Sequence, residues 1–462
     1  MSAPFAAAAT NAEKDAKVRD WIARNISPTI VRFEQQPRWR GGWWVDVEKD
    51  GKRIPLYVRE EREEDYPPWP LEHEAGALQV LERHGVPVPH VWGMIDDPHA
   101  TVMDALPGHC DFSTVSEAER VAVLEAFAEA VARQPATPPQ DLADALGLKL
   151  PETPEDISLG CFRICEEMYL KGKKLPEPRV EFLRQWVYRN IPRHRSRVSV
   201  LAVDSGQFLF QDGRITGLYD FEYASLGDPL IDVAFIPLRL SMHNAGDVSP
   251  FFRRYAELTG DRLELDVLAF HAVWWGMCTP FILTPDLHAP GPRAKYFEYA
   301  GWYMGAIISQ MEVLADAKGI DLSNRMDIPP ARPSRWAQMI DVMAARLPEA
   351  DPAEPYAVTE QRKVLTFIQR ADGHRDIEAQ YFADVEALTG RAVQDWLEAD
   401  TVLERFVLAA GPEHDEALIR LFHSWAVTQA RTFLPGLAHM PMFDSHWPKL
   451  SRLVAAANEA RP

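Results

Sequence analysis

One segment of the sequence, residues 199–220, constrains the fold more than any other. It contains two strand-like stretches joined by the turn pair Asp212-Gly213, and the second stretch ends in Asp220. Asp-Gly favours a two-residue hairpin turn because both residues tolerate positive φ. Helical periodicity precedes this hairpin over about residues 115–198 and resumes after it. A strand pair inside a helical chain, without alternation of strands and helices, predicts an α+β fold for this part of the chain.

The N-terminal region carries the remaining strand signals. A helical pattern over residues 11–26 precedes strand-like sequence over residues 29–68, in which residues 49–52 (Lys-Asp-Gly-Lys) indicate a hairpin turn. Apolar residues at helical spacing predict a helix over residues 70–84. A short strand pair is expected to follow and to end at Gly108.

The C-terminal region is expected to form a separate helical bundle. Proline-rich sequence over residues 327–334 and 348–355 indicates a linker. Several amphipathic stretches follow over residues 357–460. We expect these helices either to brace the preceding domain or to form a homodimer interface.

The charge and the apolar runs limit the partners of the chain. A formal net charge of −19 repels phosphate backbones and anionic membranes, so we expect no nucleic-acid partner and no membrane partner. Residues 272–283 and 299–315 are apolar but too short and too interrupted to span a membrane, and are expected to be buried helices. No basic segment typical of a signal peptide begins the sequence, and we expect a cytoplasmic protein. Cys161 and Cys165 are expected to be reduced and half-buried.

Two motifs resemble those of a known family. The hairpin that ends in Asp220 and the stretch 103–108 (Met-Asp-Ala-Leu-Pro-Gly) are similar to segments of the aminoglycoside phosphotransferases, small-molecule relatives of the protein kinases. The resemblance covers about residues 28–320 and implies a protein-kinase-like two-lobed fold. The implied division is an N-terminal helix (1–27), a small β-rich N-lobe (28–106), a mainly helical C-lobe (107–330) and a C-terminal helical domain (331–462).

The resemblance also implies a site for ATP and Mg²⁺. Phosphoryl transfer depends mainly on positioning and charge neutralisation. The implied cofactor-binding residues are Gly41 and Gly42 beside the phosphates, Arg59 in place of the family's lysine, Glu74 as its acidic partner, and the hinge backbone around Asp104 and Leu106.

Three neighbouring positions leave alternatives open. Glu72 is one register from Glu74 and is the other candidate partner of Arg59. Trp43 and Trp44 follow the paired glycines, where the family usually has small polar residues. The two indoles either close the phosphate path or stack on a planar ligand, or they alternate on a strand with one in the core. We favour the alternation.

The first half of the catalytic segment departs from the family pattern His-Gly-Asp-x4-Asn. Counting back from Asp220 places Ala202 at the aspartate position and Gln207 at the asparagine position. Alanine accepts no proton, and a general base contributes about 10²–10⁴-fold to a rate. Asp204 is the nearest carboxylate and the candidate base, either through a remodelled loop or through a shifted alignment. By the resemblance, Asp220 and Gln207 are the metal ligands.

Two functions remain in competition. In the first, the chain is an enzyme that transfers phosphate from ATP, with Mg²⁺, to a hydroxyl of a small-molecule substrate, and Asp204 and Asp220 are its catalytic residues. In the alternative, it is a pseudokinase-like protein that keeps the scaffold and binds a ligand or performs different chemistry. Ala202 and Gln207 favour the alternative, whereas the hinge and the Asp220 segment favour the enzyme.

Overall fold

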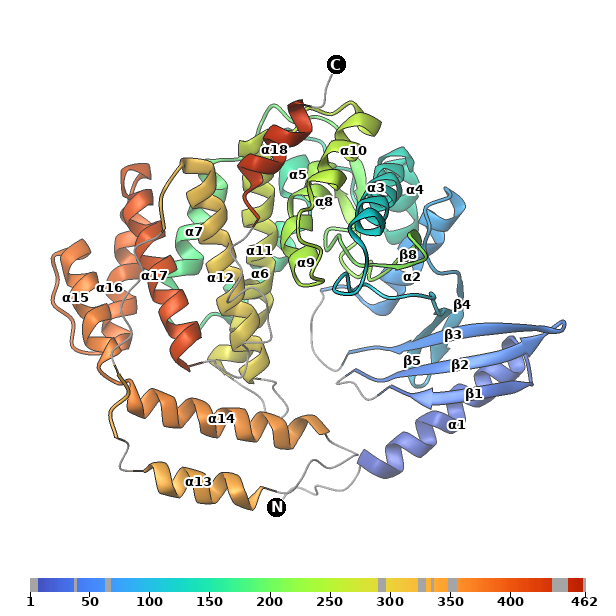
Figure 1. The fold of residues 1–462 in the computed structure, drawn as a ribbon, viewed down its shortest axis with the longest axis horizontal. Coiled ribbons are helices and arrows are strands. Elements are labelled where there is room, and N and C mark those ends of the chain that lie inside the picture. Colours follow the sequence, from blue (N-terminus) through green and yellow to red (C-terminus); the bar gives the residue numbers. More distant parts are fainter. Residues whose placement is uncertain are drawn as a thin grey trace. The chain divides into compact units, whose positions relative to one another are not determined.

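The computed structural model of this chain contains two compact units (Figure 1). One unit comprises Met1–Pro151 and Val198–Pro229, and the other comprises Glu152–Arg197 and Leu230–Pro462. The structure describes residues 7–36, 40–62, 68–289, 296–322, 330–333, 336–347, 355–433 and 448–459.

The first unit is built on a five-stranded antiparallel sheet of order β1-β2-β3-β5-β4. Its β2–β3 turn has Asp50 and Gly51 at φ 53° and 72°, the left-handed conformation that a two-residue hairpin requires. This confirms the hairpin predicted at residues 49–52. The strands are β1 (Ile30–Gln35), β2 (Gly42–Lys49), β3 (Lys52–Glu60), β4 (Val91–Asp96) and β5 (His99–Asp104).

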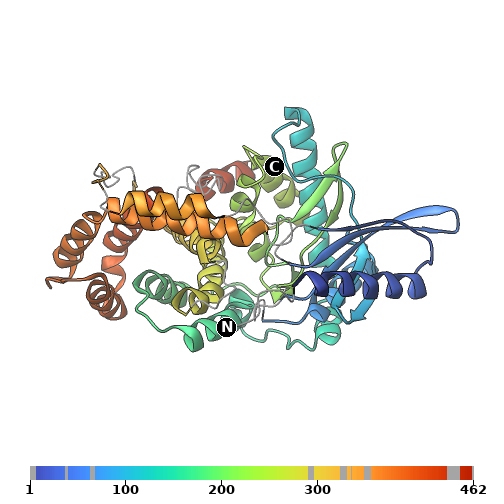
Figure 2. The ribbon, with the colours of Figure 1, turned by 90° about the horizontal axis from the view of Figure 1, so that it is seen from below.

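Helix α1 (Ala7–Asn25) packs along one face of this sheet (Figure 2). Val18 and Ile22 of α1 are fully buried in a core that includes Trp43 of β2. The indole Nε1 of Trp43 also donates a hydrogen bond to Asp15 Oδ1 on α1, at 2.6 Å. The alternation along β2 therefore places Trp43 in the core and turns the next residue, Trp44, to the other face.

The remaining elements of the first unit include the segment of residues 199–220 and helix α2 (Leu71–Arg83). Helix α2 confirms the helix predicted over residues 70–84 and contacts β4 and β5. The predicted hairpin of the segment is also present, with Asp212 and Gly213 at φ 51° and 73° in its turn. The other elements are α3 (Glu117–Arg133), η1 (Gln134–Ala136), α4 (Pro139–Leu146), the pair β7 (Phe208–Gln211) and β8 (Arg214–Leu218), and the pair β6 (Ser199–Leu201) and β9 (Ser225–Gly227).

The second unit is helical, and its core is formed by α11 (Leu265–His288) packed against α12 (Tyr296–Lys318) and α6 (Phe162–Gly172). Among the described residues, α11 is the one helix with the length and apolar composition to cross a membrane, and 89% of its most apolar window is buried inside the fold. This confirms the expectation of a buried helix. The other helices are α5 (Pro154–Leu159), α7 (Pro178–Arg189), α8 (Leu230–Ala234), α9 (Ile236–Ser241), α10 (Ser249–Thr259), α13 (Ala337–Arg346), α14 (Pro355–Gly373), α15 (Ile377–Thr389), α16 (Trp396–Ala409), η2 (Pro412–His414), α17 (Asp415–Phe433) and α18 (Leu450–Glu459).

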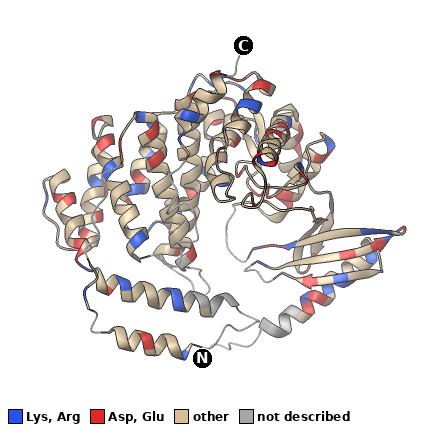
Figure 3. Cartoon of the chain, in the orientation of Figure 1, with Lys and Arg blue, Asp and Glu red and all other residues tan. Residues whose placement is uncertain are grey.

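The C-terminal helices pack on the other helices of the same unit. Helix α16 contacts α7, α17 contacts α12, and α18 contacts α10. These contacts agree with a bracing role, while the boundary at residue 331 stays a prediction. The predicted linker lies largely outside the described residues. Positive and negative residues are interspersed along α1 (Figure 3).

Two cysteines are more buried than the sequence suggested. Cys161 and Cys165 are 2% and 0% exposed, so the expectation of half-burial was wrong. They lie at and near the start of α6, which packs on α11, and Cys278 of α11 is buried beside them. None of the three forms a disulfide bond, as predicted for the first two.

Candidate functional site

A cavity of about 440 Å³ lies within the first unit. Its wall includes Trp44, Tyr57 and Arg59, which alternate along β2 and β3 with the core residues Trp43 and Val58. The Trp44 and Tyr57 rings have centroids 4.7 Å apart and form an aromatic side of the cavity. Its volume lies in the range of about 300–1,000 Å³ that is typical of small-molecule sites.

The predicted hinge forms one edge of this cavity. Asp104, Leu106 and Gly108 are all lining residues. The amide of Asp104 donates to the His90 carbonyl at 2.9 Å, which fixes the backbone at the end of β5. Gly108 has φ 101°, and a Cβ there would lie 2.2 Å from the carbonyl oxygen of Phe210. Only glycine fits this approach, which accounts for the last residue of the hinge motif.

The paired glycines lie at the start of β2 and pair with neighbouring strands. The carbonyl of Gly41 accepts from the Glu60 amide at 3.0 Å, and that of Gly42 accepts from the Gln36 amide at 2.8 Å. A Cβ at Gly41 would lie 1.8 Å from Glu60 Oε2. Arg40, the residue before the pair, lines the cavity. A phosphate-binding role for Gly41 and Gly42 stays a prediction.

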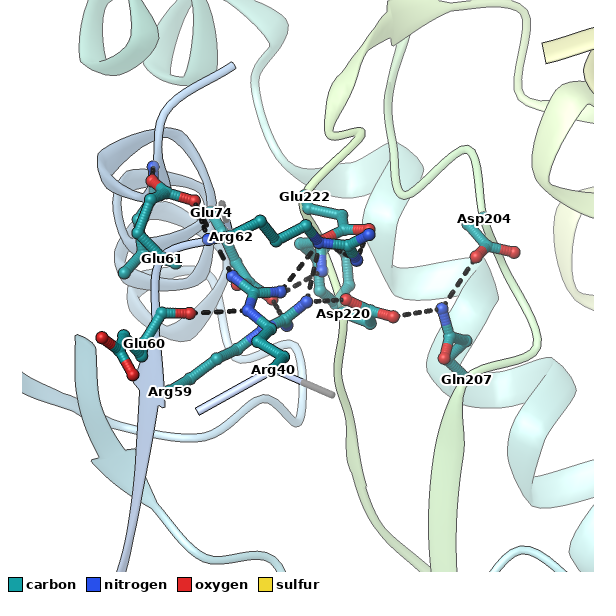
Figure 4. Close-up of polar contacts among 12 residues, drawn as sticks. Arg40, Arg59, Glu60, Glu61, Arg62, Glu74, Asp204, Gln207, Asp220 and Glu222 are labelled. Atoms are coloured by element: carbon teal, nitrogen blue, oxygen red, sulfur yellow. Dashed lines mark hydrogen bonds and ion pairs between the residues drawn. The ribbon is translucent and has the colours of Figure 1, made fainter. Parts of the chain in front are cut away.

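Arg59 is held by three carboxylates (Figure 4). Its Nη1 donates to Glu74 Oε1 at 2.6 Å, and its Nη2 donates to Asp220 Oδ1 at 2.5 Å and to Glu222 Oε2 at 2.8 Å. The structure thereby brings together three of the residues that the sequence singled out. It also shows which glutamate of α2 is the partner of Arg59. Glu74 is the partner, because Glu72 Oε1 lies 3.1 Å from His99 Nε2 instead.

Two further arginines converge on Glu222. Arg62 Nη2 donates to both Glu222 oxygens, at 2.6 and 2.8 Å, and Arg40 Nη1 lies 3.4 Å from Oε2. Arg40 is anchored by a hydrogen bond from its Nε to the Glu60 carbonyl at 2.6 Å. We call Arg40, Arg59 and Arg62 the arginine cluster; all three line the cavity.

Burial and charge act in opposite directions on these groups. Burial disfavours the charged form of Asp220, but Arg59 and Arg62 outweigh it and hold the pKa of Asp220 well below its ordinary value. Burial likewise works against charge on Arg59, yet Asp220 and Glu74 raise its pKa above the ordinary value. Glu74 differs, because burial prevails over Arg59 and raises its pKa to about 7. Arg59 and Asp220 are therefore an ionised pair, and Glu74 titrates near neutral pH.

The catalytic segment brings Asp204 to the edge of the same site. Gln207 lines the cavity, and its Nε2 donates to Asp220 Oδ2 at 2.6 Å and to Asp204 Oδ2 at 2.8 Å. Ala202, at the family's aspartate position, is buried at 5% exposure. Residues 202–204 form a three-residue turn. In it the Asp204 amide donates to the Ala202 carbonyl at 2.9 Å, and Val203 has φ 66°.

This turn is a strained feature that the sequence did not indicate. A β-branched residue with positive φ is a rare outlier, and such strain gathers at functional sites. Asp220 also has a positive φ of 67°, which aspartate tolerates better than most residues. Two residues with positive φ, Val203 and Asp220, thus orient the chain around the carboxylates of Asp204 and Asp220.

The site fits a nucleotide better than it fits magnesium. The aromatic wall and the arginine cluster suit a planar base and its phosphates. Mg²⁺ needs oxygen ligands in near-octahedral geometry, but both Asp220 oxygens already accept hydrogen bonds, Oδ1 from Arg59 Nη2 and Oδ2 from Gln207 Nε2. No group of three or more His, Cys, Asp or Glu suited to a metal ion occurs among the residues that the structure describes. The arrangement present therefore does not fit the implied ion.

The arginine cluster shows what the sequence reasoning missed. Arg40, Arg62 and Glu222 were not among the candidate residues. One signal was available, because Arg40 directly precedes the paired glycines and Arg62 follows Arg59 by three residues. That spacing does not reveal their common partner, which lies about 160 residues or more away along the chain.

Comparison with known proteins identifies the domain that carries this site. Residues 42–268 match the model of the phosphotransferase enzyme family. None of the curated proteins matches the chain. A candidate aminoglycoside phosphotransferase from Ralstonia eutropha is similar in structure, with a TM-score of 0.50, 15% identity, and coverage of 66% of this chain and 98% of that one.

Two further solved structures score lower. The aminoglycoside phosphotransferase APH(4)-Ia, in a complex with ADP and hygromycin B, has a TM-score of 0.47 and 16% identity over 63% of this chain and 96% of its own. Macrolide 2′-phosphotransferase MphH from Brachybacterium faecium has a TM-score of 0.43 and 18% identity over 63% of this chain and 98% of its own. With the family match over residues 42–268, the kinase-like fold is confirmed, and this part of the chain is similar to the phosphotransferase enzyme family.

Proposed function

We propose that this chain is a phosphotransferase that phosphorylates a hydroxyl of a small molecule from ATP, with Asp204 as the proton acceptor. The observation that carries the proposal is the Asp204–Gln207–Asp220 chain of hydrogen bonds at the cavity. It supports a carboxylate at the acceptor side even though Ala202 holds the family's aspartate position. The proposal includes a cytoplasmic location and a homodimer through the C-terminal helices.

The residues of the chain divide the work. The aromatic pair Trp44 and Tyr57 and the hinge edge would hold the base, and the arginine cluster would neutralise the phosphate oxygens. ATP, when bound, supplies the phosphoryl group, and its transfer leaves ADP and a phosphate monoester. The hydroxyl proton of the acceptor passes to a carboxylate oxygen of Asp204, which Gln207 orients. No step is assigned to magnesium, because the carboxylate of Asp220 already accepts a hydrogen bond from Arg59.

The test is a phosphotransfer assay on Asp204→Asn with a panel of small-molecule alcohols and labelled ATP. We expect kcat to fall by about 10²–10⁴-fold, the usual contribution of a general base, while nucleotide affinity is unchanged. The matched control is Asp212→Asn, the same change at an exposed turn residue where asparagine also tolerates φ 51°. Full activity of Asp204→Asn on a substrate that the wild type phosphorylates would exclude Asp204 as the base.

A second function has two specific observations in its favour. Ala202 offers no proton acceptor, and Arg59 neutralises the carboxylate of Asp220. Both suit a protein that binds a nucleotide or another planar anion without transferring phosphate. Tight nucleotide binding with no turnover on any alcohol would favour this alternative over the enzyme.

A further inference from the structure

Asp220 has the sequence position of a metal-binding aspartate, yet both of its oxygens are directed at donors of the chain. Oδ1 lies 2.5 Å from Arg59 Nη2, and Oδ2 lies 2.6 Å from Gln207 Nε2. A divalent cation at this carboxylate would stand beside a guanidinium group and an amide N–H group. Both carry positive charge toward it and would repel it.

Arg59 is fixed in this position by more than Asp220. It is 11% exposed, and Glu74 and Glu222 hold its other donors at 2.6 and 2.8 Å. Its backbone belongs to β3, which is paired on both sides, with β2 and β5. A lysine could not reach all three carboxylates in this way, because its charge is a single point whereas the guanidinium is a planar fork.

The arginine cluster is arranged around one anionic group. Arg62 and Arg59 each donate to Glu222 at 2.8 Å or closer, and Arg40 lies 3.4 Å from it. The carboxylate of Glu222 thus shows where three guanidinium groups converge. A phosphate group presents the same kind of oxygen acceptors, and one guanidinium can bind two such oxygens through two parallel N–H···O bonds. All three arginines also line the cavity, so a phosphate within it can reach them.

We propose that the Arg59 guanidinium takes the place of the divalent cation at Asp220, so that the cavity binds nucleotide phosphates through the arginine cluster without magnesium. The inference rests on the proposed function, since its ligand is the same nucleotide. It departs from the family resemblance, which implies Mg²⁺ at Asp220 and Gln207. The physical cause is the change from lysine to arginine at position 59.

The first test is a calorimetric titration of the wild-type chain with a non-hydrolysable ATP analogue, in excess Mg²⁺ and again in EDTA. We expect the two dissociation constants to agree within about threefold, a difference of less than 1 kcal/mol. A wild-type affinity that falls tenfold or more in EDTA would overturn the inference and leave the proposed function standing. Absence of binding in both conditions would overturn both.

The second test restores the family's residue. In Arg59→Lys, Asp220 loses its guanidinium neighbour, and we expect analogue binding to become at least about tenfold tighter with Mg²⁺ than with EDTA. Arg53→Lys is the matched control, because Arg53 lies on the same strand, pairs with Asp46 and does not line the cavity. It should behave as the wild type. An Arg59→Lys protein with wild-type indifference to Mg²⁺ would contradict the role of Arg59.

A third measurement needs no nucleotide. Mn²⁺ is titrated into the nucleotide-free wild-type chain and into Asp220→Asn, and bound Mn²⁺ is followed by electron paramagnetic resonance. We expect the wild type to bind no Mn²⁺ ion that is lost in Asp220→Asn. Detection of such an ion would show that Asp220 accepts a cation despite Arg59, and would refute the proposal.

Discussion

Glu74 provides a sharp test of the electrostatics of this site. Its Oε1 accepts from Arg59 Nη1 and from the amide of Phe221, while the buried Oε2 has no hydrogen-bond partner among the residues that the structure describes. Burial raises its pKa to about 7 despite the opposing effect of Arg59. Glu74→Gln replaces the carboxyl with an amide that resembles the protonated acid and cannot titrate. We expect this change to alter the pH dependence of stability and to preserve the fold.

The sign and size follow from proton linkage. The folded chain binds the Glu74 proton more tightly than the unfolded chain, with a pKa of about 7 against 4.5. The stability that this group contributes is present below the unfolded pKa and is lost as the pH rises through 7. At about 1.4 kcal/mol for each tenfold difference in proton affinity, the whole effect is about 3 kcal/mol. Roughly 2 to 3 kcal/mol of this stability is lost as the pH rises from 5 to 8.

Asp220 does not obscure this effect. Burial opposes its charge, but Arg59 and Arg62 lower its pKa well below the ordinary value, so it is ionised throughout this pH window. Glu74→Gln should therefore be within about 1 kcal/mol of the wild type at pH 5 and about 2 to 3 kcal/mol more stable at pH 8.

The assay is guanidinium unfolding of both proteins at pH 5, 6, 7 and 8, followed by circular dichroism. Glu125→Gln is the control, because Glu125 is an exposed carboxylate on α3 of the same unit and the substitution removes the same charge. Its curve should run parallel to that of the wild type. The reasoning is refuted if Glu74→Gln and the wild type share one pH slope, or if Glu74→Gln is the less stable protein at pH 8.

Three further predictions test the packing. Trp43→Ala removes a fully buried indole and should cost about 3–5 kcal/mol of unfolding free energy; Trp44→Ala, at the cavity wall, should instead weaken nucleotide binding by about tenfold through lost stacking. Equal losses of stability would contradict the assigned faces of β2. Gly108→Ala places a Cβ 2.2 Å from a backbone oxygen and should lower the melting temperature more than any exposed alanine substitution. Gly276→Ala meets Gln310 Nε2 at 1.7 Å and should cost about 1–3 kcal/mol, which Gln310→Ala in the same chain should recover if the clash is the cause.

Much of the first unit could be predicted because its signals are local. The turns at Asp50-Gly51 and Asp212-Gly213 depend on two residues that accept positive φ, and both have it in the structure. Helix α2 follows from apolar spacing within a single stretch. The β6–β9 pair was missed because each strand has only three residues and its partner lies more than twenty residues away.

The candidate site was predictable only in part. Asp204, Gln207 and Asp220 could be singled out by counting along one segment, and the structure brings them into one chain of hydrogen bonds. The turn at Val203 could not be foreseen, since a β-branched residue favours extended backbone. Arg40 and Arg62 lack a motif of their own, and their common partner Glu222 comes from a distant segment.

Residues 199–220 show what the sequence determines and what only the tertiary structure decides. The sequence alone determined the hairpin, the family resemblance and the alanine at the family's aspartate position 202, because turn chemistry and motif spacing are local properties. Only the tertiary structure decided which cation meets Asp220. The carboxylate pairs with Arg59, 161 residues away, because folding brings the end of β8 beside β3 and buries the pair where charges must be matched.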